Sequence, residues 1–440
     1  MRAHFVPFLL ALALVVSADP LPRRGTVGVA MRALPDALQK ELKLGPQEAV
    51  QASATANGLK EGDVVVAVSG HAFKSFGEYS QLIREASAGA SVKLTVIRDG
   101  KKSDLGVKFL PKSADDGDTY TTVYDHVVSN GHRIRTFVTK PKTPGKHPVL
   151  FWIQGINAST VEARLDSGNY ITSVLKPFAD DGWVTVRVEK PGVGDSEGGP
   201  ALLVGFDEEV DIYRQALKDL AKYDFVDRDQ VVVFGHSMGG CHAPIIASEH
   251  KVKAIISYGT VSDSWLEWQV KSARIQGPLG GQSRADIDRE VRKTIGVYHY
   301  LYNEKRSIEW IKQNHPELQP VIDQTSTDGV MLGNRSIKYM QEVNDRNFCD
   351  YWAKTGEARV LALFGEADWI SLREDQTQVA EVVNGVHPGY ATFKVVPQSN
   401  HIFQKALDFK DDFPKFGKPG AVFNPAIVQV MKDWIKGLSG

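Results

Sequence analysis

The sequence predicts an α/β protein in which a doubly wound, mostly parallel sheet with a helical cap follows a small α+β domain. Short, mostly apolar runs recur in the later part of the 440-residue chain, and such runs are typical of parallel strands buried on both faces. They are residues 149–153, 184–188, 231–234, 254–258, 359–365 and 391–396. The earlier part instead places short strand patterns between glycine turns, which is typical of a small antiparallel sheet.

The first residues match a secretory signal peptide. Arg2 precedes an apolar run at residues 5–16, which is shorter than a membrane-spanning helix requires. Val16-Ser17-Ala18 fits the small-residue pattern of a cleavage site. We therefore expect residues 1–18 to be removed and the mature protein to be periplasmic or secreted. An uncleaved signal anchor is the alternative.

Residues 24–112 form the predicted α+β domain. Gly58–Gly70 has the pattern of a strand between two glycine turns, and residues 92–98 alternate as a further strand. Between them, residues 75–85 have the apolar spacing of an amphipathic helix. This order of elements resembles the bacterial PDZ domains of exported proteases.

The resemblance implies a peptide-binding loop. In PDZ domains, backbone N–H groups hold the C-terminal carboxylate of a peptide, which adds a strand to the sheet edge. The match places Thr26, Val27, Gly28 and Val29 in that loop. A peptide C-terminus or a protein partner is therefore expected to bind here. The alternative is a PDZ domain that only packs against the rest of the chain.

A polar, acidic stretch, residues 113–119, is predicted to link this domain to the larger one at residues 120–440. Within the larger domain, residues 260–354 have helical patterns and are too long for an ordinary loop, so we expect a helical cap. The aromatic residues of the cap either line a substrate pocket or form the core of the cap itself. They are Trp265, Trp268, Tyr298, Tyr300, Tyr302 and Trp310.

The most specific motif is GHSMG at residues 235–239. It follows the apolar run at 231–234 and precedes a helix-compatible run. Strand, G-x-S-x-G and helix together form a nucleophile elbow, whose sharp turn exposes a serine hydroxyl at the start of the helix. A Cβ at Gly235 or Gly239 is expected to strike a neighbouring strand or helix. Ser237 is therefore the predicted nucleophile.

An acid and a histidine are expected downstream of the nucleophile, in that order. Asp368 lies just after the strand at 359–365, where a carboxylate can orient an imidazole and stabilise imidazolium. His401 follows the last predicted strand and is the expected general base. Glu366 and Asp375 are the alternative acids.

Two backbone N–H groups are expected to stabilise an oxyanion beside the nucleophile. Met238 supplies one of them, because it directly follows the serine. The loop after the strand at 149–153 supplies the other, and Ile156 is the expected donor.

These motifs resemble the α/β-hydrolase superfamily, in particular bacterial serine hydrolases of the dienelactone-hydrolase and prolyl-oligopeptidase-like type. The resemblance covers the larger domain and includes residues 183–196, a strand followed by a glycine loop. Two residues depart from the pattern: Gln154 replaces a common histidine, and Lys190-Pro191 replaces an arginine. The glycine loop has no G-K-[ST] sequence, which argues against phosphate binding, so we expect it to shape the floor of the cleft.

The composition argues against several other classes of protein. A formal net charge of −1 gives no electrostatic basis for binding nucleic acid or an anionic membrane. The two cysteines, Cys241 and Cys349, belong to no Cys/His cluster, so no metal or other cofactor is expected. Cys241 is expected to be a buried free thiol, and a disulfide between the two cysteines is the alternative.

The resemblance implies acyl transfer to water through an acyl-enzyme on Ser237. We expect a small-molecule carboxylic ester or thioester as substrate, because no acidic pair that would hold a free peptide amine is recognisable. A serine peptidase that captures peptide C-termini through its PDZ domain is one alternative. A non-catalytic PDZ scaffold is the other.

Overall fold

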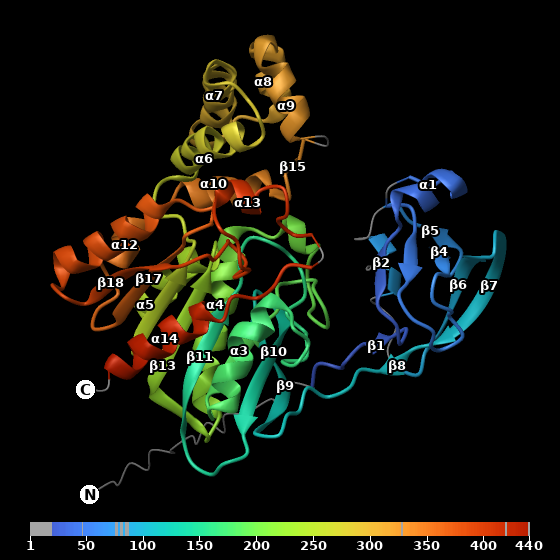
Figure 1. Cartoon of the computed structure of the whole chain (residues 1–440), viewed down its shortest axis with the longest axis horizontal. Coiled ribbons are helices and arrows are strands. Elements are labelled where there is room, and N and C mark those ends of the chain that lie inside the picture. Colours follow the sequence, from blue (N-terminus) through green and yellow to red (C-terminus); the bar gives the residue numbers. More distant parts are fainter. Residues whose placement is uncertain are drawn as a thin grey trace, which may run out of the picture.

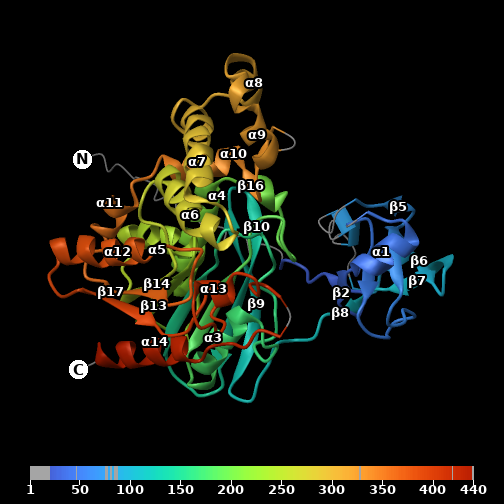
Figure 2. The ribbon, with the colours of Figure 1, turned by 45° about the horizontal axis from the view of Figure 1, so that its top comes forward.

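The computed structural model describes residues 20–45, 47–74, 78–79, 82–83, 88–326, 329–418 and 420–438. The predicted signal peptide at residues 1–18 lies outside these ranges. The described chain forms a small β-rich body and a large α/β body, which are joined by two segments (Figures 1 and 2).

The small body consists of antiparallel strands. One sheet has the strand order β2-β3-β4-β6-β7 with β5 paired to β4, and β1 pairs with β8 in a second sheet. The elements are β1 Gly25–Thr26, β2 Met31–Ala33, α1 Asp36–Leu42, β3 Val50–Ala52, β4 Val64–Val68, β5 His71–Ala72, β6 Ser91–Arg98, β7 Lys101–Lys108 and β8 Leu110–Pro111. Of the helix predicted at 75–85, Glu78, Tyr79, Leu82 and Ile83 are described and are helical, and Tyr79 is buried in the core.

Charged side chains fix the joining segments to the large body. Arg23 and Lys112 both form ion pairs with Glu162. Within the predicted linker, Asp115 is buried and pairs with Arg187 at 2.9 Å. The linker is therefore docked on the large body, which its polar composition alone does not indicate.

The large body is built on an eight-stranded sheet with the order β18-β17-β14-β13-β11-β12-β10-β9. The strands are β9 Tyr120–Ser129, β10 His132–Pro141, β11 His147–Ile153, β12 Val184–Val188, β13 Val226–His236, β14 Ala254–Tyr258, β17 Arg359–Gly365 and β18 Ala391–Val396. All pairings from β12 to β18 are parallel, and β9 and β10 form an antiparallel edge. The carboxyl ends of the parallel strands therefore meet at one end of the sheet.

Helices cover both faces of this sheet. On β11, Val149, Phe151 and Ile153 enter the core beneath α4, α5 and α12, whereas Leu150 and Trp152 enter the core beneath α3 and α14. The helices are α3 Tyr170–Asp180, α4 Phe206–Asp219, α5 Gly239–Glu249, α12 Arg373–Val386 and α14 Ala426–Gly437, with short turns η1 Ala201–Leu203 and η2 Leu220–Lys222. The predicted doubly wound sheet is confirmed.

A helical cap lies between β14 and β17, and its first helices project from the body at the top of Figure 1. Its elements are α6 Trp265–Leu279, α7 Arg284–Tyr298, η3 His299–Asn303, α8 Ile308–Asn314, η4 Pro316–Leu318, α9 Gln319–Thr325, β15 Met331–Leu332, β16 Arg335–Ser336, α10 Ile337–Asn344 and α11 Phe348–Trp352. Trp265, Tyr298 and Tyr302 are buried in the main core, so these three aromatics serve packing. In the described part of the chain, no helix is both long and apolar enough to cross a membrane.

Candidate active site

The predicted nucleophile lies in a strained turn between β13 and α5. Ser237 has a φ of 55°, in the left-handed region that non-glycine residues rarely adopt, and its N–H donates to Tyr258 O at 2.8 Å. A Cβ at Gly235 would lie 2.4 Å from Gly239 O, and one at Gly239 would lie 2.2 Å from Ile153 O. Only glycine fits at either position, so the steric expectation for the elbow is confirmed.

The predicted base and acid are hydrogen-bonded to each other. The Nδ1–H of His401 donates to Asp368 Oδ2 at 2.9 Å. Asp368 is fully buried and also accepts hydrogen bonds from the N–H groups of Ile370 and Ser371 and from the Ser371 hydroxyl. Burial opposes its ionisation, but His401 and the donors from Ser371 keep the pKa of this carboxyl below its ordinary value. The anion is thus poised to stabilise an imidazolium.

The alternative acids have other partners. Asp375 accepts hydrogen bonds of 2.9 Å from both the N–H and the hydroxyl of Ser262, and burial raises its pKa to about 6. Glu366 accepts from the N–H of Gln398. The structure brings only Asp368, of these three carboxylates, to the imidazole.

The end of β14 contacts both the serine and the histidine. Ser237 bonds to Tyr258, and a Cβ at the next residue, Gly259, would lie 3.0 Å from two atoms of the His401 ring. The Nε2–H of His236 donates to His401 O at 2.8 Å, so the two loops are tied side by side. Among the described residues no hydrogen bond links Ser237 Oγ to the imidazole. Such bonds are often formed only when substrate is bound.

The two expected oxyanion donors flank the serine. Met238 is buried and immediately precedes α5. A Cβ at Gly155 would lie 3.3 Å from Ser237 Oγ, so the loop that carries Ile156 approaches the nucleophile closely. Within the described ranges, neither the N–H of Met238 nor that of Ile156 has an acceptor in the protein. Both groups are available to a developing negative charge.

Comparison with known proteins places this geometry in a family. The model of the family described as serine aminopeptidase, S33, matches residues 164–404, more than half of the chain, and the match includes Ser237, Asp368 and His401. The chain belongs to this α/β-hydrolase family. A PDZ domain model matches residues 40–109, so the hydrolase carries a PDZ domain before it in the sequence.

Individual relatives match over part of their length. This chain is 28% identical to the probable periplasmic serine protease do/HhoA-like of Haemophilus influenzae, over 27% of this chain and 26% of the relative. It is 27% identical to the uncharacterized peptidase YtmA of Bacillus subtilis, over 40% of this chain and 60% of the relative. Among solved structures, acetyl xylan esterase 1 from Thermoanaerobacterium has a TM-score of 0.43 and 16% identity, over 74% of this chain and 86% of the other.

The loop predicted to bind a peptide carboxylate precedes the matched PDZ segment. Val27 is buried, Gly28 has a φ of 87°, and the Gly28 N–H donates to Thr26 Oγ1 at 3.2 Å. The amide of Asn57 donates to Val27 O at 3.1 Å and so holds the backbone of the loop. Among the described strands, β2 pairs with β3 alone and so lies at the edge of its sheet. In PDZ domains, an added peptide strand pairs at a sheet edge of this kind.

Sequence reasoning missed residues that hold the acid and base loops together. Asp412, in the short helix α13 (Phe409–Asp412), accepts from Asn400 Nδ2 at 2.7 Å and from Trp369 Nε1 at 2.8 Å. Its two donors directly adjoin His401 and Asp368 in sequence. No motif surrounds Asp412, so only the fold reveals this bridge.

Both cysteines of the hydrolase are free thiols, so the alternative of a disulfide between Cys241 and Cys349 is wrong. Cys241 is fully buried beside Thr260 and Val261, and burial raises the pKa of its thiol to about 12. An unreactive packing role for Cys241 follows.

No group of three or more potential metal ligands comes together among the described residues.

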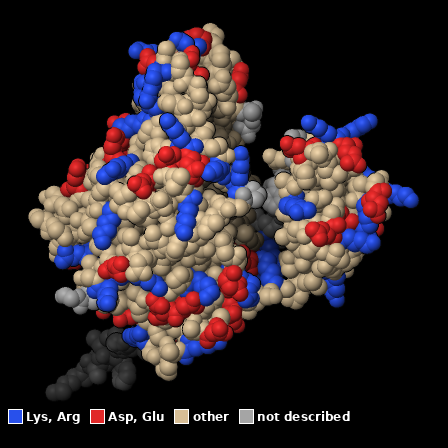
Figure 3. Space-filling view, viewed as in Figure 1, with Lys and Arg blue, Asp and Glu red and all other residues tan. Residues whose placement is uncertain are grey.

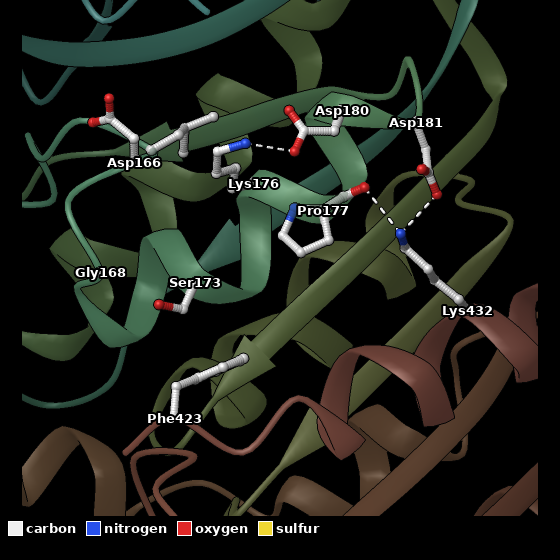
Figure 4. Close-up of a pocket in the computed structure, with 10 residues that line it drawn as sticks. Asp166, Gly168, Ser173, Lys176, Pro177, Asp180, Asp181, Phe423 and Lys432 are labelled. Atoms are coloured by element: carbon white, nitrogen blue, oxygen red, sulfur yellow. Dashed lines mark hydrogen bonds and ion pairs between the residues drawn. The ribbon is translucent and has the colours of Figure 1, made fainter. Parts of the chain in front are cut away.

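A cavity of about 570 Å³ lies between α3 and α14 (Figure 4). Its charged side chains pair with one another: Lys176 with Asp180 at 2.6 Å, and Lys432 with Asp181 at 2.7 Å. None of the predicted catalytic residues lines this cavity. On the face drawn in Figure 3, basic and acidic side chains are likewise interspersed.

Proposed function

We propose that this hydrolase cleaves a carboxylic ester or thioester through an acyl-enzyme on Ser237. The observation that carries the proposal is the His401–Asp368 hydrogen bond of 2.9 Å beside a serine held at a φ of 55°. An oriented base beside a partly buried serine is the arrangement that acyl transfer requires.

The reaction begins when Ser237 Oγ attacks the substrate carbonyl carbon and His401 Nε2 takes the hydroxyl proton. Asp368 stabilises the imidazolium, and the N–H groups of Met238 and Ile156 stabilise the oxyanion. Collapse of the tetrahedral intermediate expels the alcohol or thiol, which receives the proton from His401. Water then attacks the acyl-enzyme by the same steps and releases the acid.

Export belongs to the same proposal. The basic and apolar pattern of residues 1–18 supports secretion, and the name of one relative includes the word periplasmic. Mass spectrometry of the protein from its host is expected to find a mature chain that begins near Asp19. An intact Met1 on a cytosolic protein would contradict export.

A peptidase is the second candidate function. It is favoured by the PDZ domain, by the open edge of β2 and by the description of the family. In that case the PDZ domain would raise the local concentration of substrates that have a free C-terminus. A non-catalytic scaffold is less well supported, because a scaffold has no need of a strained serine beside an oriented imidazole.

A substrate panel separates these functions. Chromogenic acyl esters and thioesters are assayed beside aminoacyl amides and long peptides, with Ser237→Ala as the control. We expect turnover of esters or thioesters that depends on Ser237, and much slower cleavage of amides. Faster cleavage of long peptides with a free C-terminus than of the same peptides amidated would instead identify the PDZ-assisted peptidase. Turnover of no acyl substrate would favour the scaffold.

A further inference from the structure

A buried ionic cluster lies beneath the oxyanion side of the site. Glu209 of α4 is 3.0 Å from Lys190 Nζ, 2.7 Å from an Arg335 nitrogen and 3.5 Å from His242 Nε2. All four side chains are at most 1% exposed. The reaction described above uses none of them directly.

Each of the three basic side chains also donates to a backbone carbonyl beside the nucleophile. The pairs are Lys190 Nζ to Gly155 O at 2.7 Å, Arg335 to Ile156 O at 2.9 Å and His242 Nδ1 to Met238 O at 2.7 Å. Glu209 thus anchors the two cations, Lys190 and Arg335, that hold the loop carrying Ile156. Burial lowers the pKa of His242 to about 4, so this side chain is a neutral donor to the segment carrying Met238.

The contact made by Lys190 has a direct geometric consequence. Gly155 O and the N–H of Ile156 belong to the same planar peptide group, and in a trans peptide they point in opposite directions. A cation that holds Gly155 O on the buried side therefore turns the Ile156 N–H toward the opposite side. A hydrogen bond from a cation also polarises the peptide, which makes that N–H a stronger donor.

We propose that Lys190, anchored by Glu209, is a positioning residue that aims the Ile156 N–H at the oxyanion. This inference rests on the proposed function, since it assumes acyl transfer at Ser237. Arg335, on β16 of the cap, holds the next carbonyl of the same loop, so the cap contributes to the same arrangement.

The energetics of burial support a positioning role. Burial lowers the pKa of Lys190 to about 8, and Glu209 opposes that shift. Burial also opposes ionisation of Glu209, but its pairs with Lys190 and Arg335 keep the pKa of this carboxyl below its ordinary value. Buried ion pairs add little net stability compared with apolar packing. The cluster therefore serves to fix the direction of the peptide between Gly155 and Ile156.

The test compares two buried cations. Lys190→Met removes the donor to Gly155 O, and Arg187→Met removes a cation that is equally buried and bonds to Asp115, Val161 and Ala163. We expect Lys190→Met to lower kcat, and the rate of fluorophosphonate inactivation, by about 10- to 100-fold with KM within about threefold. Arg187→Met is expected to lower Tm but to keep kcat within about twofold.

Wild-type kcat in folded Lys190→Met overturns the inference, as does an equal loss of kcat in Arg187→Met. Lys190→Arg restores the positive charge and is expected to recover much of the rate. If Lys190→Met does not fold, the near-isosteric Glu209→Gln must lower kcat by at least about fivefold at unchanged KM, and a wild-type value overturns the inference. Turnover that does not depend on Ser237 overturns the proposed function itself, whereas turnover that needs Ser237 but not Lys190 overturns only this inference.

Discussion

The two sides of the candidate site are held in place by different chemistry. On the acid–base side, the loop that carries His401 is fixed by neutral donors: His236 bonds to His401 O, and the Tyr258 hydroxyl bonds to Asn400 O at 2.7 Å. On the oxyanion side, the loop that carries Ile156 is fixed by buried cations around Glu209. The acid–base side thus combines uncharged donors to the backbone of its loop with a carboxylate that holds the His401 ring, whereas buried cations hold the loop of the expected oxyanion donor.

Among variants on the two sides of the site, loss of the proposed nucleophile is expected to lower kcat the most. Ser237→Ala should lower kcat by about 10⁴-fold or more, because the acyl-enzyme cannot form. Its circular dichroism and Tm should match the wild type, since no hydrogen bond joins the hydroxyl to another described residue. Substantial esterase activity in a folded Ser237→Ala protein would contradict the mechanism on both sides of the site at once.

The acid and base are expected to follow closely. His401→Ala and Asp368→Asn should each lower kcat by about 10³-fold or more, because triad members act as a unit. Asp375→Asn is the matched control, since this carboxylate bonds to Ser262 and not to the imidazole. If steady-state kinetics find Asp375→Asn inactive and Asp368→Asn near wild type, the acid is Asp375 and not Asp368.

The bridge at Asp412 should have a smaller effect. Asp412→Asn replaces one acceptor by a donor that opposes Trp369 or Asn400, so the acid and base loops lose their common partner. We expect kcat to fall by about tenfold, through misplacement of groups that remain present. The neighbouring Asp411→Asn, whose carboxylate bonds to Leu407 and Lys415, should retain wild-type kcat. Equal kcat in both variants would show that Asp412 does not position the acid and base loops.

The smallest expected effect concerns stability and pH. Because burial raises the pKa of Asp375 to about 6, the folded state holds this proton more tightly than the unfolded chain does. The free energy of unfolding should therefore fall as pH rises from about 4 to about 6, by at most about 3 kcal/mol from this group. Urea titrations should find a flatter pH dependence in Asp375→Asn over that window. An unchanged slope would show that Asp375 ionises normally.

The sequence pointed to the proposed reacting groups but not to the residues that hold them in place. Ser237 sits in a steric motif whose glycines are required by contacts of 2.2–2.4 Å, and Asp368 and His401 follow strands that any parallel-sheet pattern reveals. Glu209 and Asp412 carry no motif, because their roles come from partners that are distant in sequence. Lys190 stood out only as a departure from the resembled pattern.

The PDZ domain illustrates the same limit. Two of its strands, β4 and β6, follow from glycine turns and alternation, both of which are local signals. The short edge strand β2 was not predicted from the sequence. How the domain is joined to the hydrolase depends instead on ion pairs such as Arg23–Glu162 and Asp115–Arg187. Pairs of that kind become visible only when both partners are placed in space.

Covalent labelling tests the central claim most directly. The full-length protein is treated with a fluorophosphonate, digested, and mapped by mass spectrometry, with Ser237→Ala and His401→Ala treated in parallel. We expect a single adduct on Ser237 in the wild type, no adduct in Ser237→Ala, and labelling slower by about 10²-fold or more in His401→Ala. An adduct on another residue, or undiminished labelling of Ser237→Ala, would contradict the assignment of Ser237 as the nucleophile.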